Sequence, residues 1–129
     1  MTYRYFGERD LREAEILLRA GGFSSAGRFA QQVVEKHLKQ FIHEKGDTQD
    51  AAILTTHNTI NLYERVVKLG GLEFNKMHHM MMSVLRNYYY DTNYPGADAR
   101  ELDEEEATDA VEFAKELIAA IKWDSGRRE

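Results

Sequence analysis

AGRFAQQVVEKHLKQFI, residues Ala26–Ile42, has the pattern of an amphipathic helix packed inside a protein. At about 100° per residue, one arc of this helix gathers Ala26, Phe29, Ala30, Val33, Val34, His37, Leu38 and Phe41. The opposite arc is polar and holds Arg28, Gln31, Gln32, Glu35 and Lys39. So wide an apolar arc is typical of a helix in a bundle, not of a narrow coiled-coil seam. We expect Ser24 or Ser25 to cap its start and Gly46 to end it.

The composition indicates one globular domain over residues 1–129. The chain has no cysteine, which excludes disulfides, thiolate zinc sites and thiol nucleophiles. No apolar run approaches the roughly 18 residues of a membrane span, and the N-terminus MTYRYFGERD does not have the pattern of a signal peptide. We therefore expect a cytoplasmic protein that does not contact membranes.

The net charge of −5 is unevenly distributed. Residues 98–116 hold nine acids against Arg100 and Lys115, which gives this segment a charge of −7 and leaves the rest with +2. The overall balance argues against nonspecific binding of nucleic acid, because no net positive charge attracts phosphates. A local basic site remains compatible with it.

Four more helices are expected around Ala26–Ile42. Tyr3–Ala20 has a helical period and ends at Gly21-Gly22. A third helix begins near Thr56–Asn58, places Ile60, Tyr63 and Val67 inward, and ends at Gly70-Gly71. A fourth spans about Leu72–Tyr90, and a fifth opens at Asp103, where Glu106 completes a capping box. Short connections between these helices predict an all-α protein, an antiparallel up-and-down four-helix bundle with an additional fifth helix.

The fourth helix is apolar over much of its girth. Its core arc is Phe74, Met77, Met81, Leu85, Tyr88 and Tyr89. Met80 and Val84 extend the apolar surface beyond that arc, so we expect a partner subunit to cover them and the protein to be a homodimer. The adjacent histidines His78 and His79 point about 100° apart and do not converge on one ion, so no metal site is expected.

Several polar residues have both a structural and a functional interpretation. Asp10 lies inside an apolar arc. Structurally it is either an exposed edge residue or a buried carboxylate satisfied by a neighbouring helix, and functionally it would orient a basic group on another helix. His57 is interpreted as structural, and Glu35 with Lys36 and Lys39 as a solvated flank. The aromatic run 88–90 either belongs to the core or stacks on bases. No P-loop, dinucleotide-binding fingerprint, HExxH motif or nucleophile elbow is present.

A weaker set of motifs resembles the HEPN domain. The matching residues are Asp10-Leu11 with Ala14-Glu15, Gly22-Phe23 with Ala26, Ala30–Lys36 with Leu38-Lys39, His57-Asn58, and Tyr94-Pro95-Gly96. The resemblance covers nearly the whole chain. It implies a compact helical bundle, commonly a homodimer, named for nucleotide binding. It also implies a partner, a minimal nucleotidyltransferase in a toxin–antitoxin-like pair.

Ribonuclease members of that family carry an Arg, a polar residue and then a His near the end of the fourth helix. Arg86-Asn87 resembles the start of this motif, but the His position falls at Asp91–Asn93, which contains no imidazole. Asp91 is the nearby alternative as a proton acceptor. Arg86 is equally well interpreted as a surface residue beside an aromatic helix end. Whether the protein is an enzyme therefore stays open, with the incomplete motif favouring a module without catalysis.

Tyr94 occupies a position that the resemblance makes interesting. Certain HEPN toxins place a Tyr two residues after the catalytic His, and their nucleotidyltransferase partner modifies it with AMP. The alternative is that the ring of Tyr94 packs over the end of the fourth helix. The candidate nucleotide or RNA site is accordingly Arg86, Asn87, Asp91, Tyr94 and Asp10, with no metal and no cofactor.

Three functions remain open on the sequence. The first is a dimeric module that binds a nucleotide or a partner protein. The second is a metal-independent endoribonuclease that uses Arg86 with Asp91 or with an unrecognised His. The third is a helical scaffold that binds no small ligand.

Overall fold

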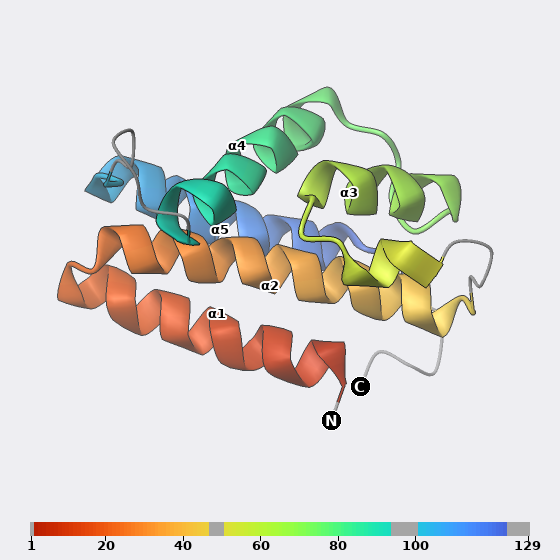
Figure 1. Ribbon diagram of the computed structural model, residues 1–129, viewed down its shortest axis with the longest axis horizontal. Helices are drawn as coiled ribbons and strands as arrows, with labels where there is room; N and C mark the ends of the chain where they lie inside the picture. Colours follow the sequence, from red (N-terminus) through yellow and green to blue (C-terminus); the bar gives the residue numbers. More distant parts are fainter. Residues whose placement is uncertain (1, 47–50, 94–100, 124–129) are drawn as a thin grey trace.

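The computed structural model describes residues 2–46, 51–93 and 101–123, and its regular elements over these ranges are all helical. They are α1 (Tyr3–Ala20), α2 (Phe23–Glu44), the 3₁₀ turn η1 (Ala51–Thr55), α3 (Thr59–Lys68), α4 (Lys76–Asn93) and α5 (Glu104–Ala120). Along the chain α1, α2, α4 and α5 alternate in direction, and α3 lies beside them as the fifth helix (Figure 1). The predicted fold class is confirmed. Within the described ranges, no helix is both long and apolar enough to cross a membrane.

α2 is the central helix of the bundle, in contact with α1, α3, α4 and α5. Its predicted apolar arc is confirmed, since Ala30, Val33, Val34 and Leu38 have no exposed surface. The assignment of its other side to solvent is wrong, because Gln31, Glu35 and Lys39 are also buried. The spacing of apolar residues in α2 indicates its apolar side, but it does not indicate that α3 and α4 cover the polar side. α2 is therefore buried on two sides, and the buried charges of Glu35 and Lys39 on its second side are paired with each other.

The helix ends follow the sequence in most places. Gly21 ends α1 with a φ of 86°, a backbone conformation that favours glycine. Asn58 caps α3, and Asp103 with Glu106 forms the predicted capping box of α5. The predicted serine cap of α2 is wrong, because its N-cap is Gly22 and makes no side-chain bond. The Ser24 hydroxyl instead accepts a hydrogen bond from the Leu102 backbone N–H at 2.9 Å, which connects α2 to the start of α5.

α4 begins later than the sequence suggests, at Lys76 and not at Leu72. The reason is Asn75, whose side-chain oxygen accepts a hydrogen bond from the His78 backbone N–H at 3.0 Å, as a residue preceding a helix does. As a result the prediction that Phe74 and Met77 lie in the core is wrong, and they are 60% and 67% exposed. Among the described side chains of this helix, Met82, Leu85 and Tyr88 are buried.

Candidate functional site

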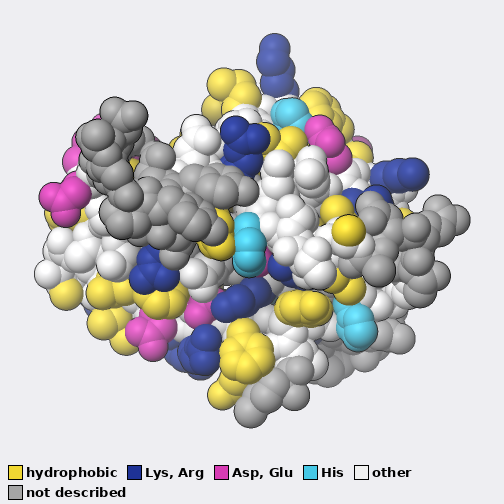
Figure 2. Space-filling view, in the orientation of Figure 1, with side chains coloured by type: hydrophobic (Ala, Val, Ile, Leu, Met, Phe, Trp, Pro, Cys, Tyr) yellow, Lys and Arg dark blue, Asp and Glu magenta, His cyan; other side chains and the backbone are white. Residues whose placement is uncertain are grey.

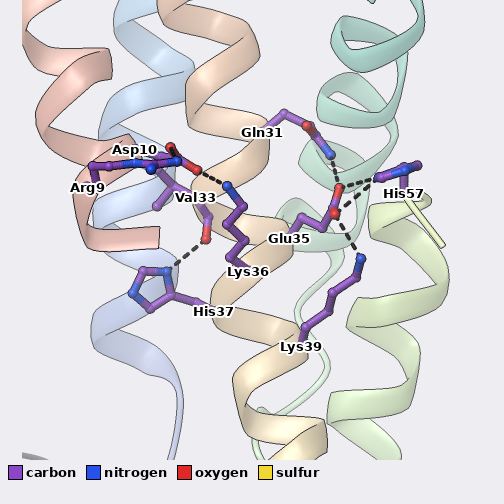
Figure 3. A network of polar contacts seen from close by, with 9 residues as sticks. All are labelled: Arg9, Asp10, Gln31, Val33, Glu35, Lys36, His37, Lys39 and His57. Carbon is purple, nitrogen blue, oxygen red and sulfur yellow. Dashed lines mark hydrogen bonds and ion pairs between the residues drawn. The ribbon is translucent and has the colours of Figure 1, made fainter. Parts of the chain in front are cut away.

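The buried carboxylate of Glu35 is the centre of a polar network between α2, α3 and α4. It accepts hydrogen bonds from Gln31 Nε2 and Lys39 Nζ, each at 2.9 Å, one turn before and one turn after it on α2. The side chains of Glu35 and Lys39 are both only 7% exposed. Figure 3 shows Gln31 and Lys39 reaching Glu35 from opposite ends, with His57 facing it from the next segment of chain. Such donors replace the hydrogen bonds to water that a carboxylate loses on burial.

His57 completes the network from outside. Its Nδ1 lies 3.2 Å from both Glu35 oxygens and donates to them. Its position is set by the capped start of α3: the Asn58 side chain accepts from the Ile60 N–H at 3.0 Å. The Thr59 hydroxyl donates to the Met82 carbonyl at 2.6 Å, which joins the start of α3 to α4. Because the carboxylate accepts a hydrogen bond from Nδ1, the neutral imidazole carries its lone pair on Nε2.

Tyr89 of α4 covers the His57 ring. The two rings are stacked, with centroids 4.6 Å apart and planes at 15°. The His57 side chain is nevertheless 48% exposed, so the ring pair reaches the surface. On the face seen in Figure 2, several Lys and Arg side chains are exposed at the surface.

Arg86 lies one helical turn before Tyr89 and so on the same face of α4. It is half-buried, and its Nε is a buried donor with no hydrogen-bond partner in the described part of the chain. Gln31 Oε1 is a buried acceptor that likewise has no hydrogen-bond partner among the described residues. Buried polar atoms without a partner are rare in folded proteins and mark places where a ligand or water completes the bonding. We call Glu35, Lys39, His57, Arg86 and Tyr89 together the His57 site.

A second polar group lies on the opposite side of α2. Asp10 of α1 is fully buried and forms ion pairs with Lys36 and Arg9. The interpretation of Asp10 as a buried carboxylate satisfied by a neighbouring helix is confirmed, and its interpretation as an exposed edge residue is wrong. Near it, His37 donates from Nδ1 to the Val33 carbonyl at 2.8 Å, and burial lowers the pKa of His37 below 6.5. Figure 3 shows that Asp10 and His57 lie on different sides of α2.

The residues proposed from the sequence are thus only partly brought together. Arg86 is included in the His57 site because it lies one helical turn before Tyr89, and Asn87 is exposed on the same helix. Asp91 is in the last turn of α4, where the structure does not describe its side chain, and Tyr94 lies outside the described residues. Asp10 is on the other side of α2 and does not belong to this site.

Sequence reasoning missed Glu35, Lys39 and His57 as members of one site. The interpretation of Glu35 and Lys39 as a solvated flank is wrong, since both are buried and paired. A signal existed in the regular spacing of Gln31, Glu35 and Lys39, four residues apart, which places them in one row on a helix that neighbours surround. Within the described residues, no three His, Asp or Glu side chains are grouped to hold a metal ion.

Comparisons with known proteins agree with this architecture. The fold is similar to the crystal structure of TT1696 from Thermus thermophilus, with a TM-score of 0.75 and 24% identity over 91% of each chain. It is also similar to ST0689, described as an archaeal HEPN homologue, with a TM-score of 0.67 and 20% identity over 91% of this chain and 89% of that one. No curated protein matches the sequence. Residues 4–123 match the HEPN domain, and the chain therefore belongs to the HEPN domain family.

Proposed function

We propose that this HEPN protein is a dimeric helical module that binds a nucleotide, free or within RNA, at the His57 site. The observation that supports this most is the surface-reaching ring pair of His57 and Tyr89 beside Arg86, whose buried Nε has no partner in the described chain. Stacking on an aromatic ring contributes about 1–3 kcal/mol per base. A guanidinium offers paired donors to phosphate oxygens. A nucleotide whose base stacks on the rings of His57 and Tyr89 and whose phosphate accepts hydrogen bonds from Arg86 would make both interactions.

The test of this proposal is nucleotide binding by site variants. We expect fluorescent ATP and a labelled single-stranded RNA to bind the wild type, and Tyr89→Ala and Arg86→Ala each to weaken binding about tenfold or more. His43→Ala, an exposed histidine near the end of α2, is the matched control and should bind as the wild type does. Equal affinity of all four proteins would refute the site, as would loss of binding in His43→Ala alone.

Dimerisation is the second part of the proposal. Met80 is 56% exposed and Val84 is half-buried, so an apolar strip on α4 is accessible to a second subunit. Light scattering coupled to size-exclusion chromatography at micromolar concentration should give twice the chain mass of 15.0 kDa. Met80→Ser with Val84→Ser should shift the protein to monomer. A wild-type monomer would refute the dimer without affecting the nucleotide site.

We further propose a minimal nucleotidyltransferase as the physiological partner, in a toxin–antitoxin-like pair, with Tyr94 as the residue that it modifies with AMP. Family membership and the position of Tyr94 after α4 support this proposal. Intact mass spectrometry after incubation with ATP, magnesium and a minimal nucleotidyltransferase tests it. A mass increase of one AMP is expected in the wild type and not in Tyr94→Phe. Equal labelling of both proteins would exclude Tyr94.

A second candidate function is metal-independent cleavage of RNA, and the contact of His57 with Glu35 favours it. In this reaction His57 Nε2 accepts the proton of a ribose 2′-OH, the 2′-oxygen bonds to phosphorus and the bond from phosphorus to the 5′-oxygen breaks. The leaving oxygen takes a proton from water, which yields a 2′,3′-cyclic phosphate and a 5′-OH. Glu35 would orient the imidazole, as a carboxylate does for other catalytic histidines.

Cleavage assays in the presence of a chelator separate the two candidates. An enzyme should cut RNA but not the 2′-deoxy analogue, and His57→Ala should abolish cutting while leaving the fold intact by circular dichroism. A pure binding module retains affinity for RNA and releases no cyclic phosphate. Because Asp91–Asn93 contains no histidine, we expect little cleavage by the wild type alone, and robust cleavage that depends on His57 would reverse that expectation.

A further inference from the structure

A groove of about 520 Å³ lies between the start of α4 and the middle of α5, away from the His57 site. Met77, Met81 and Phe113 supply its apolar lining. Three acids of α5, Asp109, Glu112 and Glu116, line it as well. It therefore combines an apolar surface with one row of negative charge.

Part of the apolar lining of the groove is exposed to solvent. Met77 is 67% exposed and Met81 is half-buried, whereas Phe113 is only 6% exposed. Methionine side chains are unbranched and polarisable, so a methionine surface adapts to different apolar partners.

The acidic row has a regular geometry. Asp109, Glu112 and Glu116 are spaced three and four residues apart, so they follow one face of α5 over about 10 Å. Glu112 and Glu116 are 63% and 68% exposed. Lys115 contacts Glu112 at 3.3 Å but also Glu15 of α1 at 2.8 Å, and His78 is 3.5 Å from Glu116. The row thus keeps most of its negative charge.

We propose that this groove binds an amphipathic helix of another protein, with apolar side chains on the methionines and Lys or Arg side chains along the acidic row. Charge complementarity selects this occupant. Nucleic acid is disfavoured because its phosphates would face three carboxylates. A second copy of this chain is also disfavoured, because a symmetric contact would place one acidic row against the other. Met80 and Val84 do not line the groove, so the dimer strip is a different set of residues.

The probe is a fluorescent peptide of about 18 residues, or five helical turns, built from Leu and Lys at amphipathic spacing. A second peptide has Glu in place of every Lys. We expect the Lys peptide to bind the full-length protein with micromolar affinity in fluorescence anisotropy, and binding to weaken at high salt. The Glu peptide should bind at least about tenfold more weakly.

Two double variants with the same change in charge locate the binding. Glu112→Lys with Glu116→Lys should weaken the Lys peptide about tenfold or more, because it reverses the acidic row. Glu8→Lys with Glu13→Lys, at exposed positions of α1, is the matched control and should retain binding. Met77→Ser should weaken both peptides to a similar extent, since it removes apolar contact without changing charge.

Three outcomes would overturn the proposal. The first is failure of the Lys peptide to bind, and the second is equal loss of binding in the groove variant and in the α1 control. The third is a change of oligomeric state in Glu112→Lys with Glu116→Lys, because it would identify a second copy of the chain as the occupant. None of these outcomes bears on the proposed nucleotide binding, because the groove and the His57 site share no residue.

Discussion

Glu35 is a carboxylate inside the molecule whose charge three neighbouring donors stabilise. Removing one member of a buried ion pair leaves the other member buried without its counter-charge, which costs about 3–5 kcal/mol of stability. We therefore expect Glu35→Leu to lower the free energy of unfolding by an amount in this range, measured by urea denaturation. Glu35→Leu combined with Lys39→Met should cost less than Glu35→Leu alone, because neither charge then remains. Additive losses in the double variant would contradict a coupled buried pair.

His37 gives the stability a defined dependence on pH. Burial lowers its pKa in the folded protein, while the unfolded chain keeps the ordinary value of 6.5. Below that value the unfolded state binds a proton that the folded state does not, so stability from this residue is present above pH 6.5 and decreases as the pH falls. The slope is at most about 1.4 kcal/mol per pH unit. Between pH 7.5 and 5.5, His37→Asn should lose less stability than the wild type.

The control for this measurement is His43→Asn, which removes an exposed histidine of the same helix. It should lose stability with pH as the wild type does. If His37→Asn and His43→Asn had the same pH dependence as the wild type, the buried imidazole would not be the titrating group.

At the scale of elements, the contact of α1 with α2 depends on Gly7. A Cβ at this position would lie 2.6 Å from Cε1 of His37, closer than real Cβ contacts occur. Alanine normally stabilises a helix by about 1 kcal/mol relative to glycine, whereas overpacking costs about 1–3 kcal/mol. We expect Gly7→Ala to be destabilising in thermal unfolding, and the loss to diminish when His37→Ala is added. If Gly7→Ala were more stable than the wild type, α1 and α2 would have to move apart at little cost to accommodate the added Cβ.

The start of α5 is the second element whose stability can be tested. The Asp103 side chain accepts from the Glu106 N–H at 2.8 Å, and Glu106 accepts in return from the Asp103 N–H at 3.1 Å. Asp103→Ala should lower the free energy of unfolding by about 1 kcal/mol, because it removes the cap. Asp109→Ala, an exposed acid on the same helix, should change it by less than about half of that. Equal effects would mean that the cap contributes nothing beyond charge.

At the scale of the whole molecule, the sequence was informative wherever the signal is local. The apolar arc of α2, the start of α3 near Thr56–Asn58 and the capping box at Asp103 all depend on residues within one or two turns. The start of α4 could not be placed, because the apolar residues Phe74 and Met77 continue a helical period on exposed positions. There the Asn75 side chain, not hydrophobicity, sets the boundary.

The site was less predictable than the fold. Glu35 and His57 are 22 residues apart in sequence, and only the packing of α3 and α4 against α2 brings them together. A helical period cannot show that a polar row will be covered by two further helices. Arg86 was found through the family resemblance, but its neighbours Tyr89 and His57 required the three-dimensional arrangement.

The central claim is that a nucleotide binds at the His57 site, and NMR titration of the ¹⁵N-labelled protein with ATP tests it most directly. We predict that the largest shifts occur at the amides of His57, Arg86 and Tyr89, and that they disappear in Tyr89→Ala. A separate hollow of about 330 Å³ lined by Tyr3, Phe6 and His43, among others, is the internal reference and should stay unchanged. Shifts confined to that hollow, or no shifts up to about 1 mM ATP, would contradict the account.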